Sequence, residues 1–133
     1  MSQIKAKHIF LVDDDEDDQF LVKQVIKQHS PESTVEVLDD GEKLIQALKH
    51  ASSLPSLVLL DLNMPRMNGL EALRHVRANQ SYDEIPIVIL TTSDNEHDRQ
   101  QALRLQATDY LVKPGSAEQM SQLVSVIKQQ WFL

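Results

Sequence analysis

The chain alternates short strand-like runs with longer amphipathic segments, and it repeats this alternation five times along its 133 residues. Each amphipathic segment carries apolar residues at helical spacing. Strands that alternate with helices of this length predict an α/β fold, in which helices cover both faces of a parallel sheet. The expected strands cover residues 8–12, 34–37, 57–60, 87–90 and 109–112.

The third run, Leu57–Leu60, is the most informative of the five. Its four residues are all apolar and show no alternation with polar residues, which is typical of a strand buried on both faces. Asp61 follows directly. A carboxylate at the end of a buried strand costs free energy unless it has a partner or a chemical role, so Asp61 is the first candidate for a functional residue.

Charge and composition exclude several functions. The formal net charge is −7 and basic residues do not cluster, which argues against binding to nucleic acid or to an anionic membrane and favours a cation as any bound small ion. The chain has no cysteine, which excludes disulfides and thiolate metal sites. No apolar stretch is long enough for a membrane span or a signal peptide. We expect one cytoplasmic domain over residues 1–133, with no output domain.

Functional side chains follow four of the five expected strands. In an open parallel sheet, ligands bind beyond the carboxyl ends of the strands, and there the sequence places Asp13, Asp14, Asp61, Thr91 and Lys113. Three carboxylates in one site repel one another unless a cation neutralises them. A set of oxygen ligands with room for water suits Mg²⁺ better than Ca²⁺.

A cation alone does not require a lysine or a threonine. Lys113 suits an anion beside the metal, because its ammonium can pair with a phosphoryl group, and Thr91 can donate a hydroxyl hydrogen bond to the same group. The chemistry that fits all five residues is phosphoryl transfer to a carboxylate, which gives an aspartyl phosphate.

Four motifs together resemble the signature of two-component response-regulator receiver domains, in particular single-domain regulators like those of chemotaxis. They occur in the order of that family and span nearly the whole chain: Val12-Asp13-Asp14, residues 61–69, Thr91-Thr92 and residues 110–114. The resemblance implies a flavodoxin-like (βα)5 three-layer sandwich with a parallel five-stranded sheet of order 2-1-3-4-5. It also implies that the Lys113–Pro114 peptide bond is cis.

The resemblance further implies a role for each matching residue. Asp61 would be the phosphoacceptor for a sensor histidine kinase. Asp14 would bind Mg²⁺ directly and Asp13 mostly through water, and the backbone carbonyl of Asn63 would be a further protein ligand beside Asp61. The protein would catalyse only its own phosphorylation and autodephosphorylation.

The remaining matching residues would bind the phosphoryl group and report it. Lys113 and Thr91 would contact the phosphoryl group, and Thr92 would line the phosphate pocket. Thr91 and Tyr110 would act as switch residues for the face of the fourth helix, fifth strand and fifth helix. That face would then bind an unidentified downstream protein, or a second copy of the chain in a homodimer.

Two other functions stay open on the residues alone. One is a Mg²⁺-dependent phosphohydrolase with an aspartyl nucleophile, although such enzymes place a second aspartate two residues on, where this chain has Asn63. The other is an unphosphorylated adaptor. We expect Asp15–Asp18 only to complement the dipole of the first helix. The Trp131–Leu133 tail would either fold back on the last helix or be exposed for a partner.

Overall fold

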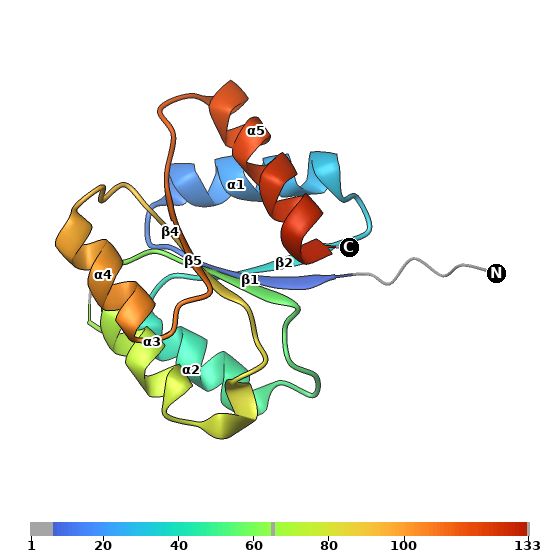
Figure 1. Cartoon of the computed structure of the whole chain (residues 1–133). Helices are drawn as coiled ribbons and strands as arrows, with labels where there is room; N and C mark the ends of the chain where they lie inside the picture. Colours follow the sequence, from blue (N-terminus) through green and yellow to red (C-terminus); the bar gives the residue numbers. More distant parts are fainter. Residues whose placement is uncertain (1–6, 65, 133) are drawn as a thin grey trace.

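The computed structural model describes residues 7–64 and 66–132. Its centre is a five-stranded sheet in the order β2-β1-β3-β4-β5 (Figure 1), and all four neighbouring pairs are parallel. This confirms the predicted α/β fold and strand order. The strands are β1 His8–Val12, β2 Thr34–Leu38, β3 Leu57–Leu60, β4 Ile87–Thr91 and β5 Asp109–Val112.

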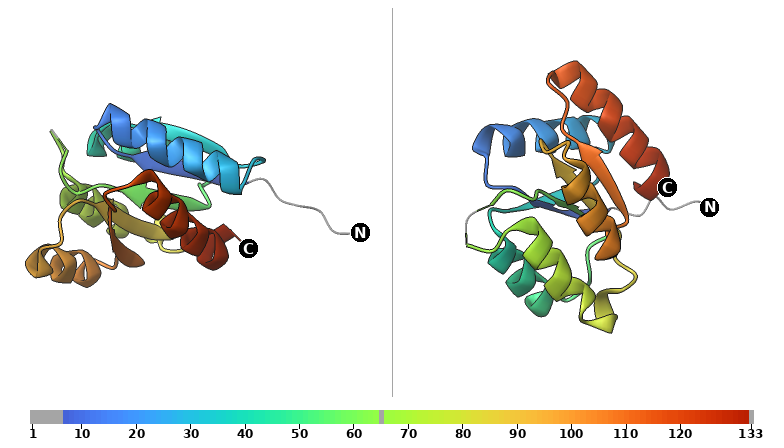
Figure 2. Two further views of the ribbon diagram at one scale, coloured as in Figure 1. Left: turned by 90° about the horizontal axis from the view of Figure 1, so that it is seen from above. Right: turned by 60° about the vertical axis from the view of Figure 1, so that its left-hand side comes forward.

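Helices cover both faces of the sheet and complete the three layers (Figures 1 and 2). One face carries α1 and α5, and the other carries α2, α3 and α4. The helices are α1 Glu16–His29, α2 Gly41–His50, α3 Gly69–Arg77, α4 Glu96–Arg104 and α5 Ala117–Ile127. Two short turns, a 3-10 turn at Gln80–Tyr82 and a π turn at Lys128–Phe132, complete the regular structure.

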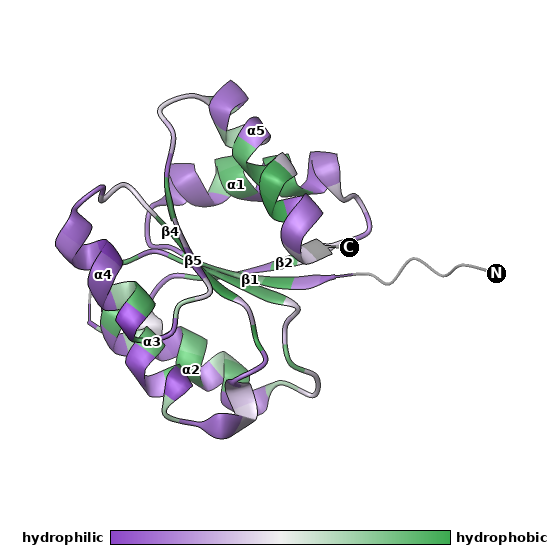
Figure 3. Ribbon diagram, viewed as in Figure 1, coloured by the Kyte–Doolittle hydropathy of each residue, from purple (hydrophilic) through white to green (hydrophobic). Residues whose placement is uncertain are grey.

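The sheet separates two apolar cores, because successive side chains of a strand point to opposite faces. In β3, Val58 and Leu60 pack with α2 and α3, whereas Leu57 and Leu59 pack with α1 and α5. Every residue of β3 is buried. Figure 3 shows the same pattern, with hydrophobic colour along the sheet and a mostly hydrophilic α4. The central strand is therefore packed on both faces, and Asp61, which follows it, is buried as well.

The apolar face of the first helix differs in part from the predicted one. The spacing predicts Phe20, Leu21, Val25 and Ile26 on this face. Val25 and Ile26 are buried as predicted and Leu21 is partly buried, but Phe20 is 70% exposed and Val22 is buried in its place. Val22, Val25 and Ile26 follow the i, i+3, i+4 rule, and Phe20 lies on the far side of the helix from them.

Two further local predictions are wrong. Ser93 and Asp94 are residue types that favour an N-cap, and the sequence predicts one of them as the cap of α4. The N-cap is instead Asn95, whose side chain accepts the backbone N–H groups of His97 and Asp98. The peptide bonds of the described residues are all trans, Lys113–Pro114 among them. Trans is the lower-energy form of such a bond by about 0.5–1 kcal/mol.

The end of the chain answers part of one open question. Trp131 is partly buried and packs against the core between the sheet and the α1/α5 layer, so this residue folds back as the first alternative predicts. The side chain of Phe132 and all of Leu133 lie outside the described residues. Within the described part of the chain, no helix is both long and apolar enough to cross a bilayer.

Candidate functional site

Backbone hydrogen bonds fix the site residues at the ends of their strands. Each of three predicted residues stands one position beyond its strand and continues the sheet by one more bond. The bonds are Asp13 N–H to Leu38 O at 2.9 Å, Asp61 N–H to Val12 O at 2.9 Å and Lys113 N–H to Thr91 O at 2.7 Å. Strands β1, β3 and β5 thus hold these three side chains at one edge of the sheet.

The predicted carboxylates come together. Asp13, Asp14 and Asp61 each offer an oxygen, and these oxygens lie within 4.8 Å of one another. Asp13 and Asp61 are buried and Asp14 is exposed. Burial raises the pKa of Asp13 above its ordinary value, although a hydrogen bond from Lys113 opposes this. Closely spaced carboxylates with no nitrogen or sulfur ligand fit a hard divalent cation.

Lys113 places a positive charge beside this cluster of carboxylates. Its Nζ lies 2.7 Å from Asp13 Oδ2, 2.8 Å from Asp18 Oδ2 and 3.2 Å from Asp61 Oδ2. Since an ammonium has three N–H donors, all of them are used. Burial alone would lower the pKa of Lys113, but the hydrogen bonds to Asp13 and Asp18 outweigh burial and raise it.

Asp18 is a site residue that the sequence prediction missed. It was expected only to complement the helix dipole, yet its carboxylate forms an ion pair with Lys113. The helix begins at Glu16, so Asp18 is its third residue and lies next to the strand ends. Asp15 fulfils the predicted role, because its side chain accepts the N–H groups of Asp17 and Asp18. The sequence carries no signal that separates Asp18 from the acids before it.

Short-range contacts orient the Asp61 carboxylate. Its Oδ1 accepts the N–H of Leu62 at 2.8 Å and that of Asn63 at 3.5 Å. Helix α3 begins close to this segment, and the N–H of its first residue, Gly69, donates to Leu62 O at 2.9 Å. A Cβ at Gly69 would lie 2.2 Å from Asp61 O. One carboxylate oxygen is therefore held by backbone, and the other faces Lys113.

The predicted switch residues meet at Ser93 rather than at the carboxylates. Thr91 is buried, and its hydroxyl accepts the N–H of Ser93 at 3.4 Å. Tyr110 is also buried, and its hydroxyl donates to Ser93 O at 2.8 Å. Thr92 is exposed. The Ser93 hydroxyl donates to Asp98 Oδ2 on α4 at 2.7 Å. Ser93 thus connects Thr91, Tyr110 and α4.

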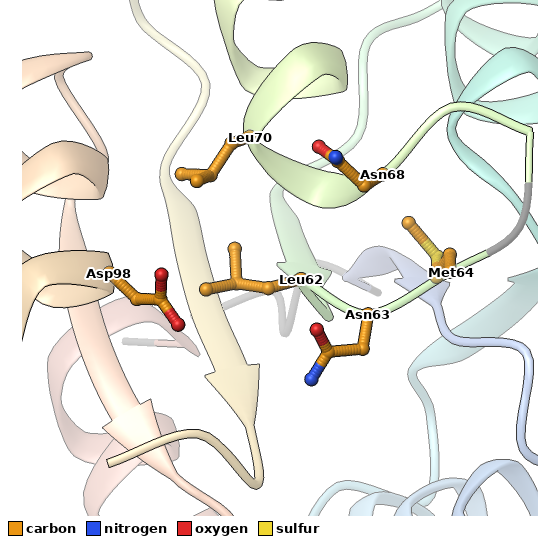
Figure 4. Close-up of a pocket in the computed structure, with 6 residues that line it drawn as sticks. All are labelled: Leu62, Asn63, Met64, Asn68, Leu70 and Asp98. Carbon is orange, nitrogen blue, oxygen red and sulfur yellow. The ribbon is translucent and has the colours of Figure 1, made fainter. Parts of the chain in front are cut away.

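A pocket of about 500 Å³ lies beside this connection. Figure 4 shows Asp98 of α4 on one side and residues of the β3–α3 segment on the other. Its lining residues are Leu62, Asn63, Met64, Asn68, Leu70 and Asp98. Helix α4 therefore lies across an open space from the loop that follows Asp61.

Tyr110 gives the site a measurable pH dependence. Burial raises the pKa of its phenol above the ordinary 10.0, although the hydrogen bond to Ser93 opposes this. Folding therefore favours the protonated phenol. The contribution of the protonated Tyr110 phenol to the free energy of unfolding is complete below about pH 10, and it is lost as the pH rises through the folded-state pKa of this phenol. Phenolate absorbance during an alkaline titration should show a late-titrating tyrosine that disappears in Tyr110→Phe; an unchanged titration in that variant would contradict the assignment.

Comparison with known proteins identifies the family. The family model of the response regulator receiver domain matches residues 9–125. The chain belongs to this family. Response regulator Rcp1 of Synechocystis sp. is 34% identical over 130 residues, which cover 94% of this chain and 88% of the relative.

Two solved receiver structures have the same fold. The phosphorylated cyanobacterial phytochrome response regulator RcpA has a TM-score of 0.90 at 31% identity, covering 96% of this chain and 94% of that one. The Mn²⁺-bound form of Rcp1 has a TM-score of 0.86 at 34% identity, covering 95% of this chain and 94% of that one. The resemblance drawn from the sequence motifs is thereby confirmed, and the chain is a receiver domain of two-component signalling.

Proposed function

We propose that this receiver domain takes a phosphoryl group from a sensor histidine kinase onto Asp61, with Mg²⁺ as its cofactor. The observation that carries the proposal is the Lys113 ammonium, which contacts the buried Asp61 carboxylate within a cluster of three acids. This arrangement pairs a nucleophile with a site for a cation and a site for an anion. The phosphorylated and Mn²⁺-bound relatives support both parts.

The proposed transfer forms one bond and breaks one. A carboxylate oxygen of Asp61 attacks phosphorus, and the bond between phosphorus and the imidazole nitrogen of the kinase histidine breaks. The leaving imidazole retains the electron pair and takes up a proton. Backbone N–H groups of Leu62 and Asn63 keep the carboxylate oriented, and the Lys113 ammonium pairs with the negative charge of the phosphoryl oxygens.

The donor set indicates which residues would hold Mg²⁺. Both oxygens of Asp13 already accept hydrogen bonds, from Asp15 N–H and from Lys113. Asp14 is exposed, which favours Asp14 as the direct ligand and Asp13 as a ligand through water. Asp61 and the backbone carbonyl of Asn63 would complete the protein ligands. When bound, Mg²⁺ neutralises charge on the transferring phosphoryl group.

The face of α4, β5 and α5 is our proposal for the output surface. Tyr110 and Asp98 join this face to Ser93. Three apolar side chains on it are more than 40% exposed: Leu103, Val112 and Val126. A groove of about 390 Å³ runs between Val112 and Val126. A downstream protein or a second copy of the chain would bind here after Thr91 turns toward the phosphoryl group.

Labelling with acetyl phosphate tests the proposal. In the presence of Mg²⁺ the protein should gain one phosphoryl group, and borohydride reduction followed by peptide mass mapping should place it on Asp61. Chelation of Mg²⁺ or the Asp61→Asn change should abolish the label. A label that persists in Asp61→Asn would show that another residue is the acceptor.

The same preparation distinguishes a phosphohydrolase from a receiver. A phosphohydrolase would turn over small phosphate esters many times per molecule, whereas a receiver retains a single phosphoryl group that it loses slowly. Asn63 stands two residues beyond Asp61 and is exposed, so it is an amide where such enzymes have a second acid. Sustained release of phosphate from esters would reverse the proposal.

A further inference from the structure

The contact between Asp18 and Lys113 has no part in the phosphoryl transfer described above. Asp18 Oδ2 lies 2.8 Å from Lys113 Nζ, which is closer than Asp61 Oδ2 at 3.2 Å and nearly as close as Asp13 Oδ2 at 2.7 Å. Its side chain is 32% exposed, whereas those of Asp13, Asp61 and Lys113 are at most 8% exposed. Asp18 comes from α1, and the other two acceptors follow strands of the sheet.

Asp18 is also outside the group that would hold a cation. That group consists of Asp13, Asp14 and Asp61. Lys113 shares Asp13 and Asp61 with it, so a cation there would compete for these two carboxylates and repel the ammonium. Asp18 is then the one acceptor of Lys113 that a bound cation leaves free to keep its hydrogen bond.

We propose that Asp18 is a positioning residue, which holds the Lys113 ammonium beside Asp61 when a cation occupies the carboxylate cluster. This inference rests on the proposed phosphoryl transfer. Lysine has a long, flexible side chain, and transfer requires its charge at a fixed point. Asp18 acts only through Lys113 and does not touch the phosphoryl group.

A matched pair of substitutions separates positioning from charge. Asp17 precedes Asp18 in the first turn of α1, is exposed, and carries the same charge. Asp17→Asn and Asp18→Asn therefore remove the same charge from the same helix terminus. Loss of a negative charge near the pocket would by itself speed reaction with an anionic donor. A positioning role predicts instead a slower reaction, and only for Asp18→Asn.

The experiment measures phosphorylation of the full chain by acetyl phosphate and Mg²⁺. We expect Asp18→Asn to slow it about tenfold, because the ammonium is no longer held in place. Asp17→Asn should react at the wild-type rate or faster, and Asp18→Glu should recover part of the loss. A rate in Asp18→Asn equal to or above that of the wild type would overturn the inference.

A second measurement does not depend on phosphorylation. In the protein labelled with ¹⁵N-lysine and saturated with Mg²⁺, the buried Lys113 ammonium should exchange its protons slowly and give an NMR signal. We expect that signal in the wild type and in Asp17→Asn, but broadened or lost in Asp18→Asn. If the wild type accepts no phosphoryl group, the proposed function fails, and the NMR signal alone tests whether Asp18 positions Lys113. A signal unchanged in Asp18→Asn would then overturn the role of Asp18.

Discussion

Replacing Lys113 with methionine is expected to destabilise the metal-free protein by about 3 kcal/mol, because it leaves buried charges without a partner. The side chain of Lys113 is only 5% exposed and forms ion pairs with Asp13, Asp18 and Asp61. Methionine is unbranched and only one atom shorter than lysine, so little of the loss would come from packing. Urea denaturation in the presence of a chelator measures the free energy of unfolding.

Addition of Mg²⁺ should recover part of this loss. A cation bound to the carboxylates stabilises the folded state in proportion to its affinity, and that affinity should rise when the competing ammonium is removed. Lys43→Met is the control, because Lys43 pairs with Asp39 at the surface and exposed pairs contribute little. A Lys113→Met protein as stable as the wild type in chelator would show that the cluster does not depend on this lysine.

Gly69→Ala is expected to cost about 3 kcal/mol of stability, at the upper end of the range for overpacking. The added Cβ would lie 2.2 Å from Asp61 O and 2.7 Å from Leu62 Cα. Both are backbone atoms of the segment that carries Asp61, the proposed phosphoacceptor, so no side-chain rotation can relieve the contact. Thermal or urea denaturation should show the loss, and acetyl phosphate labelling should be slower because the Asp61 carboxylate is displaced.

Gly115→Ala is the matched control. A Cβ at Gly115 would meet nothing within 4 Å, and its backbone does not have a positive φ. Alanine there should leave stability unchanged or raise it by about 0.4–1 kcal/mol, through a less flexible unfolded chain. Equal stability of the two variants would contradict the close approach of α3 to Asp61.

The sequence predicted the fold because its local signals agree with its global topology. Buried strands such as Leu57–Leu60 have a pattern that few other structures share, and each amphipathic segment has one apolar face. Parallel strands bring their carboxyl ends to one edge, so the approach of Asp13, Asp61 and Lys113 followed from topology alone. The structure brings these side chains within hydrogen-bonding distance.

The remaining features depend on how each helix is rotated about its axis and where it begins, and the sequence pattern does not specify either. The spacing placed Phe20 on the apolar face of α1 with Val25 and Ile26, but in the structure Val22 joins those two residues in the core with α5 and Phe20 is exposed. Asp18 is one acid in a run of six, and only the position of the first helical turn brings it to Lys113. The N-cap of α4 is Asn95, and the hydroxyl of Ser93 bonds the Asp98 side chain rather than the first backbone N–H groups of the helix.

The bonds of Ser93 set a limit on what mutation can change in this domain. Two of its hydrogen bonds use main-chain atoms: its N–H donates to the Thr91 hydroxyl, and its carbonyl accepts the Tyr110 hydroxyl. Any residue except proline retains both groups. The Ser93 hydroxyl makes the contacts to α4, because it donates to Asp98 and accepts the N–H of Asn95, the N-cap residue of that helix. Substitution of Ser93 is therefore expected to change how firmly α4 is attached, while the main-chain bonds to Thr91 and Tyr110 stay in place.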